Sequence, residues 1–310
     1  MIQVNDITFR YAGQKDYVFD GFSLTLEQNN IYGLLGKNGT GKSTLLYLIS
    51  GLLRPLRGNV IVDGIDARKR NADMLSELFL VPEEFSLPPI SLDEYVRLNS
   101  PFYPHFSREI LEACLTDFEL QPSLRLDALS MGQQKKAFMS FAMAAGTRLL
   151  LMDEPTNGLD IPSKSQFRKV VAEYMSKERT LIISTHQVHD VEMLLDHVLM
   201  LTPKQLLLDK SVEELTSRYV FEFRTSSDLQ PSALDPQPSA LNPQPSSLNP
   251  QPSALDPQPS SLSPQPSLDV IYAEPSLQGM AVIAERQEGA AETQLNLELL
   301  FNAVTKGLIK

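Results

Sequence analysis

The sequence predicts an α/β protein built on a mostly parallel β-sheet, and three observations lead to that prediction. Short segments at 31–35, 148–155 and 179–186 have the length and the apolar centre of buried strands, and the last two end in polar residues. Segments with helical periodicity, at 42–53 and 161–177, lie between them. Strands that alternate with helices favour a parallel sheet, and such sheets bind ligands at the carboxyl ends of their strands.

The remaining elements follow from local patterns. Residues 2–35 alternate apolar and polar side chains as strands do, most clearly at 22–26, and 59–64 predicts a strand that closes in a turn. From about 84 to 145 the pattern becomes helical, with an amphipathic stretch at 107–120 that follows a serine cap. A helical region is therefore expected between the early strands and the later ones.

A proline-rich repeat interrupts the C-terminal part of the chain. Residues 231–267 repeat a seven-residue unit with two prolines in each copy, which excludes a helix and favours an extended, solvated segment. We interpret it as a tandem duplication tolerated in a loop, with a partner-binding tract as the alternative. The flanking residues, 220–230 and 268–310, predict a small strand–strand–helix unit, with a hairpin about Gly279 and a helix at 292–307.

Composition argues against several classes of protein. The 310 residues carry a net charge of -11, so no basic stripe for nucleic acid is expected. The single cysteine, Cys114, cannot form an intramolecular disulfide and is expected in the core. No apolar signal segment and no stretch long enough to span a membrane occurs, so we expect a cytoplasmic protein that reaches a membrane only through a partner.

The first chemical motif is GKNGTGKS at 36–43, which fits the phosphate-binding pattern G-x-x-x-x-G-K-[ST]. A predicted strand precedes it and a predicted helix follows, as a P-loop requires. Glycines let backbone N–H groups curl around phosphates at a helix N-terminus. We expect Lys42 to reach the β- and γ-phosphates of a nucleotide and the Ser43 hydroxyl to bind Mg²⁺. A glycine-rich surface turn is the structural alternative.

Polar residues follow the next two apolar strands. Asp153 and Glu154 end the first of them, and His186 ends the second. Beside a P-loop, Asp153 is expected to hold Mg²⁺ directly or through water, and Glu154 to polarise the attacking water. Because adjacent residues on a strand point to opposite faces, the two acids suit two roles. His186 is expected to contact the γ-phosphate. Without a P-loop, Asp153 and Glu154 would be interpreted as a surface turn, and His186 as a solvated strand end.

Taken together, these motifs resemble the nucleotide-binding subunits of ABC transporters over about residues 2–215. The stretch LSMGQQKK at 129–136 is similar to the signature of that family, usually L-S-G-G-Q. The resemblance implies two subunits facing head to tail, with the signature of one closing over ATP held by the other. It assigns Ser130, Gly132 and Gln133 to that contact in trans.

The resemblance also implies domains and further site residues. It predicts an ATPase cassette at 1–219, with an antiparallel β subdomain and a helical subdomain at about 84–145. Tyr11 would stack on adenine, and Asp160 would span the dimer interface, although a strand aromatic and a helix cap are the alternatives. The residues assigned to ATP are Tyr11, Gly36, Lys37, Asn38, Gly39, Thr40, Gly41, Lys42, Ser43 and Thr44.

Two positions depart from the family pattern. Met131 stands where the signature usually has glycine. Glu83 stands where the family commonly has a glutamine that reaches Mg²⁺ and relays to the membrane partner. Glu83 can still serve the Mg²⁺ site by accepting a hydrogen bond from a water on the ion, but it adds negative charge beside Asp153 and Glu154.

The function that the resemblance implies is ATP hydrolysis coupled to transport. The chain would use ATP and Mg²⁺, form a homodimer or pair with a paralogous subunit, and drive a separate membrane permease. It would lie on the inner face of the cell membrane through that permease, with no nucleic-acid partner. Export is the expected direction and import the open alternative. The alternative function is a soluble ATPase of this type, or a nucleotide-gated scaffold that does not drive transport.

Overall fold

The structure is a computed structural model, which describes residues 1–121, 124–203, 205–224, 270–276 and 279–310. The proline-rich repeat predicted at 231–267 lies outside these residues. Among the helices of the described ranges, none is both long enough and apolar enough to cross a membrane.

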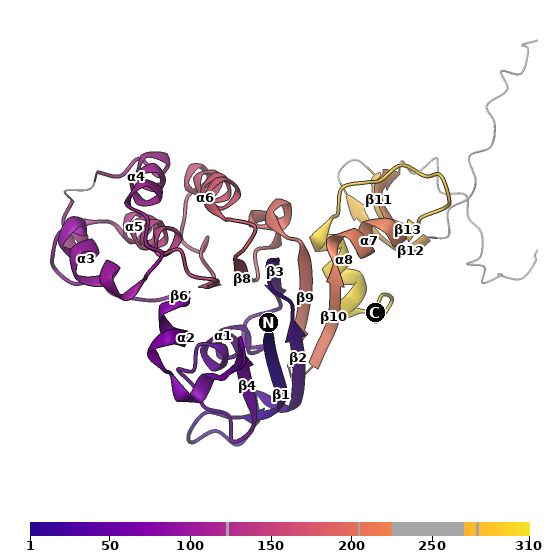
Figure 1. Cartoon of the computed structure of the whole chain (residues 1–310). Helices are drawn as coiled ribbons and strands as arrows, with labels where there is room; N and C mark the ends of the chain where they lie inside the picture. Colours follow the sequence, from indigo (N-terminus) through magenta and orange to yellow (C-terminus); the bar gives the residue numbers. More distant parts are fainter. Residues whose placement is uncertain (122–123, 204, 225–269, 277–278) are drawn as a thin grey trace, which may run out of the picture.

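A six-stranded sheet occupies the centre of the molecule (Figure 1). In spatial order its strands are β10 (Gln205–Ser211), β9 (His197–Thr202), β3 (Ile31–Leu35), β8 (Thr180–Thr185), β7 (Leu149–Asp153) and β6 (Leu78–Val81). The last five run parallel, whereas β10 pairs antiparallel with β9 at one edge. The mostly parallel sheet predicted from the sequence is confirmed.

Both faces of this sheet are buried, which is why its strands are apolar throughout. Leu34 and Ile182 face one side and pack in one core cluster, while Leu35 and Ile183 face the other side and pack in a second cluster. All four side chains are at most 1% exposed. Successive side chains therefore still alternate between the two faces of the sheet, although the sequence shows only a continuous run of apolar residues.

A second, antiparallel sheet covers one face, as predicted. Its strands, in spatial order, are β2 (Phe19–Leu26), β1 (Ile2–Phe9), β4 (Arg57–Val62) and β5 (Ile65–Asp66). Helix α1 (Lys42–Ile49) contacts β4 of this sheet and β7 and β8 of the central sheet. A short helix, α2 (Ala72–Ser76), precedes β6. The N-terminal end of α1 is thereby anchored at the edge where the central strands end.

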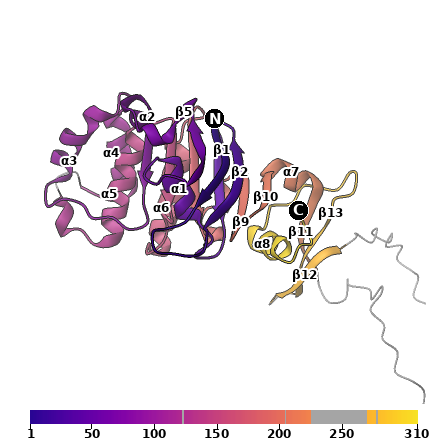
Figure 2. The same ribbon diagram turned by 90° about the horizontal axis from the view of Figure 1, so that it is seen from below.

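Helices cover the other face and extend beyond the sheet. They are α3 (Leu92–Asn99), α4 (Arg108–Asp117), α5 (Met131–Ala144) and α6 (Ile161–Tyr174). Figures 1 and 2 show α3, α4 and α5 grouped on one side of the molecule, with the C-terminal elements on the opposite side. Cys114 lies in the core of the helical group with no exposed surface, as predicted.

The C-terminal elements form a small three-stranded antiparallel sheet with two helices. They are α7 (Val212–Arg218), β11 (Tyr219–Arg224), β12 (Val270–Ser276), β13 (Gly279–Glu285) and α8 (Leu297–Thr305), and the strand order is β11-β13-β12. The start of α8 is tied to the segment after β8. The Leu297 N–H donates to Glu192 Oε1 at 2.6 Å, and His189 Nε2 lies 2.6 Å from Glu298 Oε2.

Two predicted helix boundaries are wrong, each for a local reason. The helix expected at 42–53 ends at Ile49, because Gly51 adopts a left-handed backbone with φ of 71° that stops it before Pro55. The helix expected at 292–307 begins only at Leu297, where the Asn296 side chain accepts the N–H of Leu299 as an N-cap.

Candidate functional site

Strand register brings three functional segments to one edge of the central sheet. Leu35, the last residue of β3, pairs with Thr185, the last residue of β8. Asp153, the last residue of β7, pairs with Ser184. The P-loop, Glu154 and His186 each start one residue beyond these strand ends, so parallel pairing alone places them side by side.

The P-loop conformation requires its glycines. A Cβ on Gly36 would lie 2.5 Å from the Leu201 carbonyl oxygen, so a side chain has no room there. Gly41 has φ of 102°, in the left-handed region, and it immediately precedes α1. The Thr40 hydroxyl donates to the Lys37 carbonyl at 2.9 Å and steadies the turn. The loop therefore presents backbone N–H groups at a helix N-terminus, where anions bind.

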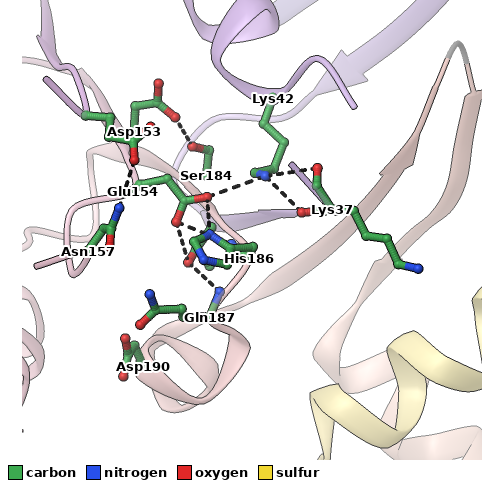
Figure 3. Close-up of polar contacts among 12 residues, drawn as sticks. Lys37, Lys42, Asp153, Glu154, Asn157, Ser184, His186, Gln187 and Asp190 are labelled. Atoms are coloured by element: carbon green, nitrogen blue, oxygen red, sulfur yellow. Dashed lines mark hydrogen bonds and ion pairs between the residues drawn. The ribbon is translucent and has the colours of Figure 1, made fainter. Parts of the chain in front are cut away.

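Lys42 is buried and directed back into its own loop. Its Nζ donates to the Gly36 carbonyl at 2.8 Å and to the Lys37 carbonyl at 3.4 Å. It also forms an ion pair with Glu154 Oε1 at 3.4 Å. Figure 3 shows the Lys42 ammonium inside this cluster, whereas the Lys37 side chain points away from it. A buried, immobilised ammonium at this position can bind phosphate oxygens.

Glu154 is held by contacts from the end of β8. Its Oε1 lies 2.8 Å from His186 Nδ1, and its Oε2 accepts from the Thr185 hydroxyl at 3.1 Å and from the His186 N–H at 3.3 Å (Figure 3). Its backbone is left-handed, with φ of 44°, and begins a turn closed by the Asn157 N–H on the Glu154 carbonyl at 3.1 Å. The expectation from simple strand alternation is wrong in detail, because the chain leaves the strand at Glu154.

Asp153 is a buried carboxylate with one oxygen to spare. It has no exposed surface, and the Ser184 hydroxyl donates to its Oδ1. Its Oδ2 is buried and has no hydrogen-bond partner in the described residues. Burial raises the pKa of Asp153, while the hydroxyls of Ser184 and Ser43 oppose that rise. An orphaned carboxylate oxygen beside a serine hydroxyl suits a hard divalent cation, so these residues fit Mg²⁺.

Glu83 lies beside the same carboxylates, two residues beyond the end of β6. Its Oε1 accepts from Asn157 Nδ2 at 2.8 Å, so the turn after β7 holds it. It lines the same hollow as Ser43 and Glu154, and, besides burial, its charge raises the pKa of Asp153. The third predicted Mg²⁺ ligand is therefore near the other two, on a neighbouring strand end.

A hollow of about 350 Å³ collects most of the predicted nucleotide residues. It is lined by Tyr11, Gln14, Val18, Asn38, Gly39, Gly41, Lys42, Ser43, Thr44, Glu83 and Glu154. The Tyr11 hydroxyl lies 2.9 Å from the Thr44 hydroxyl, and its ring meets Phe9 edge to face at 5.1 Å. These contacts orient the partly exposed Tyr11 ring at the rim, where a planar base could stack on it.

The signature residues lie elsewhere on the same chain. Ser130 caps α5 in a capping box, because its hydroxyl accepts the Gln133 N–H at 3.3 Å and the Gln133 side chain accepts the Ser130 N–H at 3.0 Å. Met131 is 74% exposed beside them. Asp160 caps α6 by accepting the Ser163 N–H at 2.9 Å. Among the described residues that line the hollow, the signature contributes none.

Four residues of the site were not predicted from the sequence. Thr185 is one of them, because its hydroxyl donates to Glu154 Oε2 at 3.1 Å. Ser184 contacts Asp153, Asn157 holds Glu83, and Lys135 donates to the Asn157 carbonyl at 2.8 Å. Lys135 falls on the buried face of α5, four residues before Met139 in the row that continues to Met143. That spacing was visible in the sequence and indicates a buried lysine.

A phosphate-binding loop between a parallel strand and a helix, with carboxylates at the end of the next strand but one, defines a nucleotide-binding P-loop ATPase. The family model described as "ABC transporter" matches residues 19–157. The cobalt import ATP-binding protein CbiO of Salmonella paratyphi A is 33% identical over 221 residues, covering 67% of this chain and 80% of CbiO. The chain belongs to the family of ABC transporter ATP-binding proteins.

Other similar proteins agree with this family. The ABC transporter ATP-binding protein NatA of Bacillus subtilis is 28% identical over 239 residues, covering 74% of this chain and 95% of NatA. A solved ATP-binding cassette, a dimer in a post-hydrolysis state bound to ADP and Pi, has a TM-score of 0.60 and 22% identity. That match covers 68% of this chain and 99% of the cassette, and it supports the fold.

Proposed function

We propose that this chain binds and hydrolyses ATP as a head-to-tail dimer and thereby drives a separate membrane permease, in the direction of export. The observation that supports hydrolysis best is the meeting of Lys42, Asp153, Glu154 and His186 at one edge of the sheet. A protein that only bound nucleotide would not need a buried carboxylate fixed by a histidine and a threonine hydroxyl.

Each residue at this edge has a role that follows from its position. Backbone N–H groups of residues 36–43 and the Lys42 ammonium bind the phosphates. Glu154, fixed by the Thr185 hydroxyl, accepts a hydrogen bond from the attacking water and aligns it. His186 orients Glu154 and contacts the γ-phosphate. Mg²⁺, held by Ser43, Asp153 and Glu83, would supply positive charge that stabilises the phosphate oxygens.

The dimer supplies the groups that one chain lacks at its hollow. Ser130, Met131 and Gln133 are exposed at the start of α5, and a helix N-terminus favours an anion. We propose that Ser130, Gly132 and Gln133 close over ATP bound by a second subunit, and that Asp160 lies in the same interface. The similar cassette solved as a dimer supports this arrangement.

Copurification tests the transport part of the proposal. The native protein, extracted with detergent from membranes, should be recovered with a multi-span membrane protein in a 2:2 or 2:1 ratio. Inverted vesicles that contain the complex should accumulate the transported solute when ATP is added outside, if the direction is export. Recovery only from the soluble fraction, with ATPase activity intact, would instead support a soluble mechanochemical role.

A further inference from the structure

Lys135 is a buried lysine in the signature segment, close to the carboxylates of the same subunit. Its side chain is 6% exposed. Its Nζ donates to the carbonyls of Asn157 at 2.8 Å and Glu154 at 3.4 Å. Both carbonyls belong to the turn that follows β7, so one ammonium joins helix α5 to the segment that carries Glu154. In the described part of the chain, no carboxylate lies within ion-pair distance of Lys135.

A buried ammonium needs negative charge nearby to remain charged. Burial lowers the pKa of Lys135, and the nearby carboxylates Glu83, Glu154 and Asp153 oppose that shift, Glu83 most strongly. The same reasoning applies to the carboxylates. Three acids gathered at one strand edge repel one another, and a positive charge behind them reduces that repulsion. Lys135 and the acids therefore stabilise one another's charged forms.

Contacts connect Lys135 to Glu83 through a single residue. The Asn157 carbonyl accepts from Lys135 Nζ, and the Asn157 side-chain amide donates to Glu83 Oε1 at 2.8 Å. Glu83 is the position at which this chain departs from the family pattern by adding a negative charge. The structure places a positive charge near this added negative charge, because the buried Lys135 ammonium contacts the other end of Asn157.

We propose that Lys135 is a positioning residue that balances the charge of Glu83 and, through Asn157, fixes both Glu83 and the turn of Glu154. The inference rests on the proposed ATPase function for its kinetic consequence only. Because Lys135 lies on the same helix as Ser130, it ties the contact made with a partner's ATP to the hydrolytic carboxylate of its own subunit.

The proposal predicts that Lys135 and Glu83 are coupled. Lys135→Met should lower kcat at saturating ATP and Mg²⁺ by ~10-fold or more, with little change in the KM for ATP. The acids lose the counter-charge on the α5 side, whereas Lys42 and the rest of the P-loop are untouched. The double variant with Glu83→Gln should have a kcat at least about threefold higher than that of Lys135→Met alone. The reason is that removing both charges leaves neither of them unpaired.

Lys136→Met is the matched control on the same helix. Lys136 Nζ donates to Gln166 Oε1 at 2.8 Å, on α6 and outside the carboxylate cluster. Its effect should combine with that of Glu83→Gln additively. Additive effects of Lys135→Met and Glu83→Gln, or a double variant slower than either single variant, would overturn the proposal.

The thermal unfolding midpoint gives a second readout of the same cycle that does not depend on activity. Glu83→Gln should raise the midpoint in the Lys135→Met background and lower it in the wild type. If the Lys135→Met variant does not fold but the double variant with Glu83→Gln does, the coupling is supported. If neither the single nor the double variant folds, the coupling is refuted. A wild-type protein without ATPase activity would refute the proposed function, and the midpoints would still decide on the coupling.

Discussion

The Nδ1 atom of His186 lies 2.8 Å from Oε1 of Glu154, and Nζ of Lys42 lies 3.4 Å from the same oxygen. One carboxylate oxygen thus contacts both the residue expected on the γ-phosphate and the lysine of the P-loop. The other oxygen accepts from the Thr185 hydroxyl at 3.1 Å. A carboxylate fixed this way is preorganised to align a water near bound phosphate.

Glu154→Gln should therefore abolish hydrolysis while leaving ATP binding intact. Glutamine preserves the size of the side chain but is a poor acceptor for a proton, so we expect kcat to fall by ~10²–10⁴-fold. ATP that is bound but not hydrolysed should trap the dimer, which size-exclusion chromatography with ATP and Mg²⁺ can detect. Hydrolysis by this variant at the wild-type rate would disprove the role of Glu154.

Binding measurements separate that effect from damage to the P-loop. Lys42→Ala removes the ammonium that lies among the Gly36 and Lys37 carbonyls. It should weaken ATP binding and prevent ATP-dependent dimerisation, in contrast to Glu154→Gln. Equilibrium binding of a fluorescent ATP analogue distinguishes the two variants, and equal loss of binding in both would contradict the separate roles.

Docking of the C-terminal helix should depend on pH through His189. The side chain of Glu298, followed by Glu192, raises the pKa of His189 above its usual value of about 6.5. The stabilisation of the folded protein by protonated His189 is complete below the pKa that this histidine has in the unfolded chain. It is lost as pH rises through the higher pKa that His189 has in the folded protein. Because the pair is largely exposed, we expect an effect of ~0–1 kcal/mol.

The unfolding midpoint measured between pH 5 and 9 tests this expectation. His189→Gln should flatten the decrease in stability that begins as pH rises above about 6.5, without changing the P-loop contacts. His105→Gln is a matched control, because His105 is also exposed and lies 3.2 Å from a glutamate, Glu77, on a different part of the surface. A wild-type profile that His189→Gln leaves unchanged would argue against the pair.

Deletion of 231–267 should leave ATPase activity nearly unchanged. Two prolines in each repeated unit prevent regular backbone pairing, so the segment is expected to contribute little packing. The comparison is kcat and the amount of folded protein for the deleted and full chains. A large loss of either would refute the interpretation of the repeat as a tolerated loop insertion.

The sequence predicts the parts of the site that depend on local pattern. The P-loop, the acids after β7 and the histidine after β8 are each visible as short motifs, and the alternation of strands and helices predicts that they meet. What it does not predict depends on tertiary contacts. The left-handed backbone at Glu154 and the contacts that Lys135 makes with the turn after β7 are visible only in the folded chain. Similarly, the end of α1 depends on one glycine, Gly51.

The spare oxygen of Asp153 is another feature that only the structure reveals. The sequence places an acid at the end of β7, but its pairing with Ser184 comes from the register of two strands far apart in the chain. The prediction of Glu83 as a nearby ligand required family resemblance. Its contact with Asn157 and its relation to Lys135 required coordinates.

The most direct test of a shared ATP site is to mix two inactive variants. Ser130→Ala removes the signature hydroxyl and an N-cap worth ~1 kcal/mol, so its folding is checked first by thermal unfolding. Lys42→Ala disables the P-loop. A mixed head-to-tail dimer keeps one site with an intact P-loop from one subunit and an intact signature from the other. Equal mixing should restore about a quarter of the wild-type ATPase rate. If both variants are folded and form mixed dimers in the presence of ATP, but the mixture stays as inactive as its components, the claim that two subunits share each ATP site is contradicted.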